Sequence, residues 1–390
     1  MPTNKKVGII TLYRGYNYGT SLQAYALKSF ISSLGYETEI IWTTEGAYFG
    51  RDIRLKKIFR MLFRMIFHPQ LIKKTIMGYK NTLFKKFDIN IKIKFIEFAK
   101  QELKIKAFTE KGIIEYAKSD DVKALVCGSD QIWNADSANM EPLYFLRFAP
   151  TNKRVAYAPS FGRTYVPKYN EKKLIKYLKD FPYISVREDD GAKIIKYLIN
   201  REVPVLIDPT LLLDWDEWKV ETKIKDKNYI VAYFLDKPSK TALKSIKCIS
   251  EKYNYRIISF PYKYNSYKYL QQIFYPKIGP KEFIEIIKNS RCLFTDSFHG
   301  TIFSINMNVP FWTFERSSKS GNSQKSRLNS ILNKLNMEKQ YITEDNDINL
   351  DIPLLSFNRS NEYIQKERIK SKEYLMKIFR DIEEVNDKKQ

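Results

Sequence analysis

The chain has 390 residues, 44% of them hydrophobic, and a formal net charge of +23 at pH 7. This length and apolar content predict a globular protein with two cores and exclude a disordered chain. The charge indicates an anionic partner, which is nucleic acid, a membrane surface or a phosphorylated ligand.

The three cysteines are widely spaced and odd in number. They show neither a metal-ligand spacing nor a disulfide framework, so no metal site is predicted and the thiols are expected to be reduced and buried. The polar N-terminus has no signal-peptide pattern, and no apolar run is long enough to cross a bilayer. The expected location is therefore the cytoplasm.

The first half of the chain alternates strand-like and helix-like patterns. An apolar strand over residues 7–13 leads through a loop with Gly15 and Gly19 into a helix over residues 20–33. Further strands are predicted at residues 37–43, 122–127, 154–158, 183–186 and 203–207. This order predicts a largely parallel sheet wound with helices, which forms an N-terminal domain over residues 1–213.

A basic helical insertion, about residues 51–118, interrupts this domain. Residues 51–106 contain 16 Lys/Arg and 4 Asp/Glu, a local net charge of +12. Within residues 51–67, apolar residues repeat at helical spacing: Leu55, Ile58, Phe59, Leu62, Phe63 and Ile66. Four basic residues lie largely off this stripe: Arg54, Lys57, Arg60 and Arg64. Such a helix either lies on an anionic membrane surface or packs its stripe on the core, and both alternatives stay open.

The alternation of strands and helices starts again after a polar linker at residues 214–227. Strands are predicted at residues 229–235, 255–260, 292–294 and 310–314, and helices at residues 239–251, 281–289 and 302–307. They indicate a C-terminal domain over residues 228–345. Residues 346–390 form a C-terminal segment, whose charged helix at residues 361–384 is expected to fold back over the first domain. Two such domains face a cleft, with ligands at the carboxyl ends of the strands.

The loop around His299, one of only two histidines, is the most informative stretch. It lies between the strand that ends at Phe294 and the helix predicted from Ile302. Unpaired backbone N–H groups at a helix start favour an anion, and an imidazole can transfer a proton near neutral pH. The alternative is a histidine that caps or packs. The neighbouring Asp296 and Gly300 favour a functional site.

Three other strand-end loops carry polar side chains. The loop with Asn17 and Tyr18 has a weak phosphate-binding glycine spacing. The loop at residues 128–134 suits a sugar, because it combines polar groups with the flat face of Trp133, although a turn with a buried tryptophan fits as well. Its polar residues are Asp130, Gln131 and Asn134.

Basic side chains that could bind an anion occur at two further places in the sequence. Arg187, at a strand end, can bind a carboxylate or phosphate through two parallel hydrogen bonds, or pair with Glu188 or Asp189. Residues 317–327 are predicted to form a basic loop that either closes on an anion or is simply solvated. Its cations are Lys319, Lys325 and Arg327.

Six motifs, in order between about residues 7 and 330, together resemble the polysaccharide pyruvyl transferase family. They are Asn17-Tyr18-Gly19, LQAYAL at 22–27, GSDQIWN at 128–134, SVRE at 185–188, DPTLL at 208–212 and TDSFHG at 295–300. The resemblance implies an α/β fold with two Rossmann-like domains facing a cleft, similar to the GT-B glycosyltransferases. It also implies transfer of pyruvate from phosphoenolpyruvate, as co-substrate, onto a sugar as a ketal, with no metal or redox cofactor.

The resemblance places phosphoenolpyruvate near His299 in the C-terminal domain and the acceptor sugar against the N-terminal domain. The expected donor-binding residues are Arg187, Ser297, His299, Gly300, Thr301, Lys325 and Arg327, and the expected acceptor-binding residues are Asn17, Tyr18, Gln131, Trp133 and Asn134. Several family members have Arg-Leu before this histidine, where Ser297-Phe298 stand here. A donor-binding cation is therefore expected from Arg187, Lys319, Lys325 or Arg327. Proton transfer is assigned to His299 or Asp130.

The expected acceptor is a sugar of a cell-surface polysaccharide or of its lipid-linked precursor. The basic insertion would then bind the inner face of the cell membrane as a peripheral attachment, and nucleic acid is not an expected partner. Two other functions stay open. One is a GT-B-type glycosyltransferase that uses a nucleotide sugar in the same cleft. The other is a non-catalytic basic protein whose binding to membranes or nucleic acid depends on salt.

Overall fold

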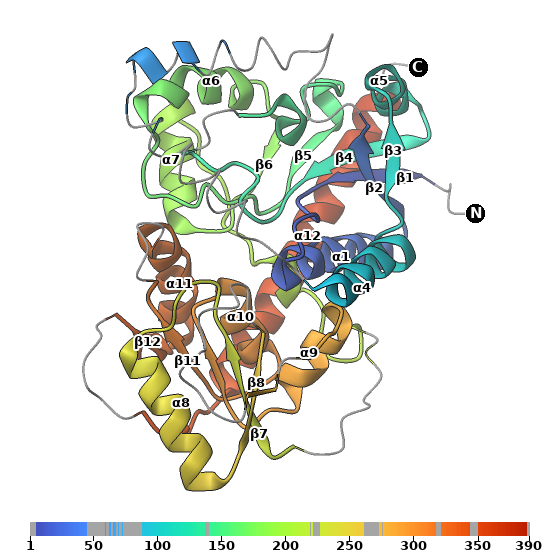
Figure 1. Ribbon diagram of the computed structural model, residues 1–390. Helices are drawn as coiled ribbons and strands as arrows, with labels where there is room; N and C mark the ends of the chain where they lie inside the picture. The colour runs from blue at the N-terminus through green and yellow to red at the C-terminus, as the bar shows by residue number, and fades with distance from the viewer. Residues whose placement is uncertain are drawn as a thin grey trace.

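The computed structural model describes residues 5–44, 88–136, 140–218, 220, 227–260, 273–274, 276–316, 321–343 and 350–387, with residues 59, 62–63, 65–67, 69 and 72 of the insertion. The side chains of residues 273, 321–326, 386 and 387 are not part of this description. Two α/β domains lie one above the other in Figure 1, each built around a parallel sheet.

The N-terminal sheet has the strand order β3-β2-β1-β4-β5-β6, and every pairing is parallel. Its strands are β1 (Lys6–Ile10), β2 (Glu37–Thr43), β3 (Lys106–Phe108), β4 (Val122–Cys127), β5 (Arg154–Ala156) and β6 (Tyr183–Ile184). The connections change direction between β1 and β4. In open parallel sheets, ligands bind beyond the carboxyl ends of the strands at such a switch point.

Helices connect these strands and cover the sheet. They are α1 (Tyr18–Ser33), α4 (Ile89–Phe98), the π-helix η1 (Ala99–Leu103), α5 (Glu110–Lys118), α6 (Lys168–Leu178) and α7 (Asp189–Ile199). Three short 3₁₀ turns accompany them: η2 (Pro142–Phe145), η3 (Thr151–Lys153) and η4 (Pro209–Leu211). All six residues of β4 are buried, as expected for a central strand of a parallel sheet with both faces covered.

The C-terminal sheet repeats the same order of connections, as β12-β11-β10-β7-β8-β9. Its strands are β7 (Tyr229–Tyr233), β8 (Arg256–Ser259), β9 (Ile273–Phe274), β10 (Leu293–Thr295), β11 (Phe311–Phe314) and β12 (Tyr341–Ile342). Its helices are α8 (Lys240–Tyr253), α9 (Pro280–Lys288), α10 (Phe298–Asn306) and α11 (Gly321–Leu335), with the 3₁₀ turn η6 (Glu338–Gln340). The second switch point lies between β7 and β10. The predicted fold class, two Rossmann-like domains facing each other, is confirmed.

The long helix α12 (Asn358–Asp387) joins the two domains at the back of the view in Figure 1. Near its end, Glu383 pairs with Lys5 and Lys123 of the N-terminal domain. Closer to its start, Arg368 donates hydrogen bonds to the carbonyls of Leu211 and Leu213. The prediction that the C-terminal helix folds back over the first domain is therefore confirmed.

Three predicted elements differ from the structure. Residues 203–207 make only an isolated bridge from Val205 to Val186, because Pro204 has no N–H to continue a ladder. The insertion, predicted as helical, also contains the edge strand β3, whose three residues are too few for a periodic signal. Residues 321–327, predicted as a loop, begin α11, which buries Leu328, Leu332 and Leu335 on one face.

The basic helix predicted at residues 51–67 lies largely outside the described residues, including Arg54, Lys57, Arg60 and Arg64. Within the described part of the chain, no helix is both long and apolar enough to span a membrane.

Candidate functional site

The two loops at the first switch point are tied together by Gln23, which lies on α1 and is completely buried. Its side-chain amide donates to the Thr11 hydroxyl and to the Leu12 carbonyl, both at 2.8 Å, after β1. Its Oε1 accepts from the backbone N–H of Ser129, after β4, at 3.2 Å. A buried polar side chain that is satisfied on both sides fixes the loops at a defined distance. We did not predict this role of Gln23.

The Asp130 carboxylate is held at the start of α1. Gly128 has φ +133°, and a Cβ there would overlap the Tyr157 carbonyl oxygen, so the chain turns here on a residue that only glycine fits. Asp130 follows with φ +57° and is 8% exposed. Its Oδ2 accepts a hydrogen bond from the Thr20 hydroxyl at 3.0 Å.

The second switch point is built by polar side chains around the start of α10. Ser297 caps the helix by accepting from the Gly300 N–H at 3.3 Å. The Thr301 hydroxyl donates to the Ser297 carbonyl and is 2.6 Å from the Thr313 hydroxyl on β11. The helix therefore begins at Phe298, four residues before its predicted start, and His299 lies in its first turn. The Ser297 and Thr301 side chains and the Gly300 N–H therefore make hydrogen bonds that form this helix start.

Asp296 holds the loop after β7 against β10. Its carboxylate accepts from the backbone N–H groups of Leu235 at 2.6 Å and Asp236 at 2.8 Å. Burial raises the pKa of Asp296 to about 6, against the opposing effect of Arg316 and these two N–H groups. Asp296 thus positions the loops around His299.

His299 lies where the two domains meet. It is 7% exposed and packs against Gly19 of α1, since a Cβ at Gly19 would overlap the imidazole. Its Nε2 is 3.7 Å from Oδ2 of Asp208, which is too far for a hydrogen bond but close enough for an ion pair with an imidazolium. The start of α1 is thus in direct contact with the His299 side chain across the domain junction.

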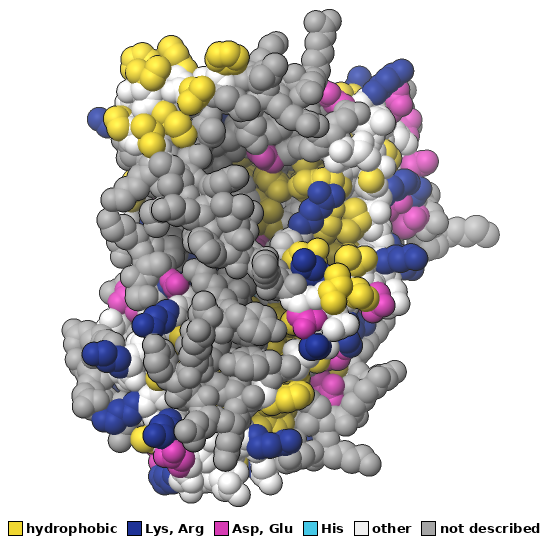
Figure 2. All heavy atoms as spheres, viewed as in Figure 1, with side chains coloured by type: hydrophobic (Ala, Val, Ile, Leu, Met, Phe, Trp, Pro, Cys, Tyr) yellow, Lys and Arg dark blue, Asp and Glu magenta, His cyan; other side chains and the backbone are white. Residues whose placement is uncertain are grey.

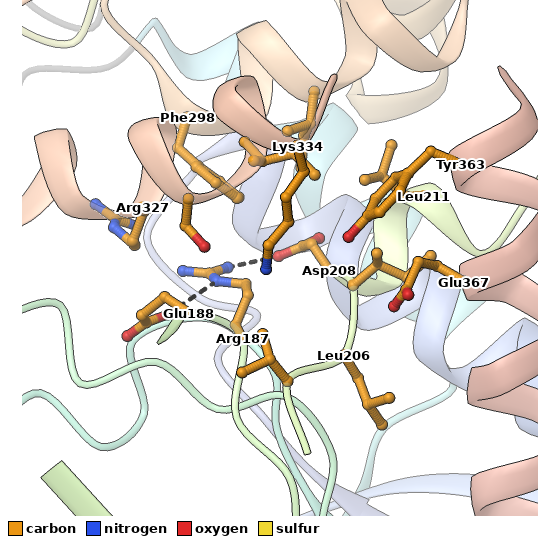
Figure 3. Close-up of a pocket in the computed structure, with 15 residues that line it drawn as sticks. Arg187, Glu188, Leu206, Asp208, Leu211, Phe298, Arg327, Lys334, Tyr363 and Glu367 are labelled. Atoms are coloured by element: carbon orange, nitrogen blue, oxygen red, sulfur yellow. Dashed lines mark hydrogen bonds and ion pairs between the residues drawn. The ribbon is translucent and has the colours of Figure 1, made fainter. Parts of the chain in front are cut away.

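Arg187 is the centre of a buried charged cluster (Figure 3). Its Nη1 is 2.5 Å from Oδ2 of Asp208, its Nη2 is 3.9 Å from Oδ1 of Asp130, and its Nε is 3.9 Å from Oε2 of Glu188. Burial alone would raise the pKa of Asp208, but the attraction of Arg187 and His299 outweighs it and holds this pKa below its usual value. For Glu188, burial prevails and the pKa is raised.

Phe298 occupies the space between two arginines. Its ring centre is 4.5 Å from the guanidinium carbon of Arg187 and 5.3 Å from that of Arg327 on α11. Stacking on an aromatic face holds a guanidinium in place while leaving its edge available for hydrogen bonds. Burial and the neighbouring Arg187 lower the pKa of Arg327. Arg327 therefore brings a second cation next to Phe298, the residue directly before His299.

Four buried polar atoms of this cluster make no hydrogen bond within the described residues. They are Nε2 of His299, Nε and Nη2 of Arg187, and Oε2 of Glu188. Buried polar groups are normally satisfied by protein, water or a ligand. Their concentration between the two switch points indicates a place that a polar ligand completes.

A cavity of about 30 Å³ adjoins this cluster, lined by residues that include Arg187, Asp208, Phe298, Arg327 and Lys334 (Figure 3). It has room for about two water molecules, whereas ligand pockets are typically about ten times larger. The domains are held together beside it, where Asp189 accepts from Ser330 and Lys334. This cavity is therefore too small to hold a substrate.

The predicted acceptor residues have different surroundings. Asn17 caps α1 by accepting from the Thr20 N–H, and Asn134 accepts from the Asp136 N–H. Gln131 is partly exposed in the loop beside Asp130. Tyr18 stacks on Phe283 with ring centres 4.4 Å apart and is buried.

Trp133 is 0% exposed and stacks on Phe145 at 5.2 Å in the core. The rings of Trp133 and Tyr18 therefore have no face open to a sugar. This burial corrects the expectation that Trp133 offers a flat face to the acceptor, because the strand-end loop turns its largest apolar side chain inward.

The arginines and lysines predicted to bind the donor fall into two groups, those whose side chains the structure describes and those whose side chains it does not. Arg187 and Arg327 lie on either side of Phe298 near His299, whereas the side chain of Lys325 and all of Lys319 fall outside the described residues. Among the described residues, no group of three or more His, Cys, Asp and Glu side chains is arranged to hold a metal ion. The carboxylates of Asp130, Glu188 and Asp208 surround Arg187 instead.

Arg187→Lys is expected to raise the KM for the donor by roughly tenfold or more, because a lysine keeps the charge but not the planar fork. Initial rates over a range of donor concentrations measure this effect. The matched control is Arg201→Lys, since Arg201 binds the Phe181 and Pro182 carbonyls away from the cluster. An unchanged donor KM would contradict a donor-binding role of Arg187.

Comparison with solved structures finds matches of low sequence identity that cover most of the chain. The UDP-GlcNAc 2-epimerase of Neisseria meningitidis, bound to UDP-GlcNAc, is 8% identical, with 97% of this chain and 100% of that chain covered and a TM-score of 0.46. A putative UDP-N-acetylglucosamine 2-epimerase from Listeria monocytogenes is 11% identical, with 97% and 91% covered and a TM-score of 0.44. AviGT4, a glycosyltransferase involved in avilamycin A biosynthesis, is 9% identical, with 97% and 98% covered and a TM-score of 0.45.

No curated protein matches the chain. The family model of the polysaccharide pyruvyl transferases matches residues 17–318, which include the second switch point, Arg187 with its three neighbouring carboxylates, and the His299 helix start. The chain therefore belongs to the polysaccharide pyruvyl transferase family.

Proposed function

We propose that the protein transfers pyruvate from phosphoenolpyruvate onto a sugar of a cell-surface polysaccharide, or of its lipid-linked precursor, as a ketal. The observation that carries the proposal is the set of unsatisfied buried atoms on His299, Arg187 and Glu188 between the two switch points. Family membership supports transfer to a polysaccharide. The paired guanidiniums of Arg187 and Arg327 support a donor with a carboxylate and a phosphate.

The reaction needs one proton delivered and two removed. The methylene carbon of the donor takes a proton to become a methyl group, and cationic character develops at the neighbouring carbon. One sugar hydroxyl attacks that carbon and loses its proton, and a second hydroxyl of the same sugar closes the ketal as the bond to phosphate breaks. The second hydroxyl proton leaves with inorganic phosphate, so that atoms and charges balance.

Two groups suit the proton transfers. We assign delivery of the proton to the methylene carbon to His299, which lies in the first turn of α10 with Asp208 at 3.7 Å. Asp130, on the opposite domain and hydrogen-bonded to Thr20, is placed to accept the hydroxyl proton. Arg187 lies within 4 Å of Asp130 and of Asp208, which is itself next to His299. An acid and a base on opposite domains would act together only when the cleft is closed.

The direct test is incubation of the protein with phosphoenolpyruvate and a panel of free and lipid-linked sugars, with inorganic phosphate and the mass of the sugar product measured. We expect phosphate release in step with pyruvylated sugar. Nucleotide sugars serve as alternative donors in the same assay. Glycosyl transfer from one of these, without turnover of phosphoenolpyruvate, would overturn the proposal in favour of a glycosyltransferase.

The insertion supports a lipid-linked acceptor. The described residues of the predicted apolar stripe are strongly exposed: Phe59 70%, Leu62 50%, Phe63 62% and Ile66 72%. Figure 2 shows apolar side chains gathered on the surface beside α6, where the described residues of this segment lie in Figure 1. This exposure disfavours the alternative in which the stripe packs on the core. We propose that the segment attaches to an anionic membrane surface.

Wild-type protein is expected to sediment with vesicles that contain anionic phospholipid, and salt should weaken this binding. Changing Arg54, Lys57, Arg60 and Arg64 to Glu should release the protein from the vesicles, since each basic residue near such a surface contributes about 1 kcal/mol. Activity on a soluble sugar should survive the four changes, whereas activity on a lipid-linked sugar should fall. Absence of wild-type binding at low salt would refute the membrane attachment without affecting the proposed reaction.

A further inference from the structure

Four residues form a cluster at the carboxyl edge of the N-terminal sheet, which we call the aromatic platform: Tyr13, Arg14, Trp42 and Tyr144. Tyr13 and Arg14 follow β1, and Trp42 lies near the end of β2. The guanidinium carbon of Arg14 is 5.3 Å from the ring centre of Tyr13 and 5.1 Å from that of Trp42. Tyr13 and Trp42 meet edge to face at 5.7 Å, and Trp42 and Tyr144 are 6.1 Å apart.

The platform is accessible, in contrast to Trp133 and Tyr18. Its three rings are partly exposed and Arg14 is exposed. Nε of Arg14 donates to the Tyr13 hydroxyl at 2.9 Å, but its two terminal nitrogens and the Trp42 indole N–H donate to no other described residue. Aromatic faces beside available donors suit a pyranose, whose C–H face is apolar and whose hydroxyls need directed hydrogen bonds.

The platform also adjoins the proposed base. The Trp133 indole N–H donates to the Tyr144 carbonyl at 3.0 Å, so the loop that carries Asp130 also positions Tyr144. Burial and the charge of Glu141 raise the pKa of the Tyr144 hydroxyl, and Asp130 contributes in the same direction. Through the hydrogen bond from Trp133, the loop that carries Asp130 lies beside Tyr144.

We propose that the aromatic platform is the acceptor subsite. A pyranose ring stacks against Trp42 and Tyr13, Arg14 donates to its hydroxyls, and the two hydroxyls that form the ketal point toward Asp130. This inference rests on the proposed function for the identity of the reaction, but the binding of a sugar to these four residues can be tested separately. It gives Trp133 a positioning role, through Tyr144, in place of direct contact with the sugar.

The kinetic test compares KM values for the two substrates, with phosphoenolpyruvate as donor and the methyl glycosides of galactose, glucose and mannose as acceptors. Trp42→Ala should raise the acceptor KM by roughly tenfold, the scale of one aromatic contact, and leave the donor KM unchanged. Trp42→Phe should recover most of the loss, because it keeps a ring face. Arg14→Gln, at an exposed position where folding is not at risk, should raise the acceptor KM several-fold.

The matched control is Tyr253→Ala. Tyr253, at the end of α8, is exposed and has the Lys252 ammonium 4.8 Å from its ring, but it lies far from β1 and β2 in the C-terminal domain. This variant should change neither KM. If Trp42→Ala and Arg14→Gln both leave the acceptor KM of an active enzyme unchanged, the platform is not the acceptor subsite.

A binding measurement separates this inference from the proposed reaction. Saturation-transfer NMR with the same methyl glycosides needs no turnover. Binding to wild type that is lost in Trp42→Ala and Arg14→Gln supports the platform even if phosphoenolpyruvate is not consumed, in which case only the proposed reaction fails. Equal sugar binding by wild type and both variants, or no binding by wild type, overturns the platform.

Discussion

His299→Ala is expected to lower turnover by at least about 100-fold, the usual effect of removing a general acid or base, while leaving the fold intact. The imidazole lies in the first turn of α10, and its Nε2 makes no hydrogen bond within the described residues, so its loss removes no interaction that holds the helix start. Ser297, Thr301 and Thr313 maintain that start without it. Phosphate release under saturating substrates measures the effect.

The control for this variant is His68→Ala, which removes the only other histidine of the chain. It should keep wild-type turnover. Thermal unfolding of both variants should resemble that of wild type. Near-normal turnover of His299→Ala would contradict a role for the imidazole in proton transfer.

Gly19→Ala is expected to lower activity nearly as much as His299→Ala, although it adds a single methyl group. Gly19 lies in the first turn of α1, where alanine is a better helix former than glycine, so the backbone itself tolerates the change. The added Cβ would overlap the His299 imidazole, which must then move or push the domains apart. Displacing a reacting group by about 1 Å costs roughly 100-fold in rate, so kcat/KM should fall by about that factor.

A matched glycine is available in α5. Gly112 also lies in the first turn of a helix, and a Cβ there would meet the Thr109 hydroxyl at 3.2 Å and the Phe108 side chain at ordinary contact distances of 3.6 Å and more. Gly112→Ala should therefore leave kcat/KM unchanged. Full activity in Gly19→Ala would show that the close contact between α1 and His299 is not maintained in the reacting enzyme.

The negative charge of Asp208 lies between Arg187 of the N-terminal domain and His299 of the C-terminal domain. Its folded-state pKa lies below the usual value, so its ionised form stabilises the fold above the ordinary carboxyl pKa. This stabilisation is lost as the pH falls through the depressed folded-state pKa. Since Asp208 holds Arg187 and lies near His299, acid should weaken the junction between the domains along with the site.

Most of the fold could be predicted from the sequence, because its signals are local. The predicted strands at residues 37–43 and 122–127 have the same bounds as β2 and β4. Apolar, β-branched runs separated by amphipathic helices specify parallel strands with both faces covered. Where a local signal was weak or misleading, the prediction failed: Pro204 interrupts an apolar run, and Gly321 and Ser323 obscure the start of α11.

The sequence by itself determined the alternating architecture, the family and the strand-end loops that carry His299, Asp130 and Arg187, because strand ends in parallel sheets collect at one edge. Only the tertiary structure decided which side chains of those loops face the cleft. Trp133 turns into the core and Phe298 lies between Arg187 and Arg327, because packing density and charge pairing between distant segments fix side-chain direction. Trp42 and Tyr13 lie 29 residues apart and meet only because β1 and β2 are neighbours in the sheet.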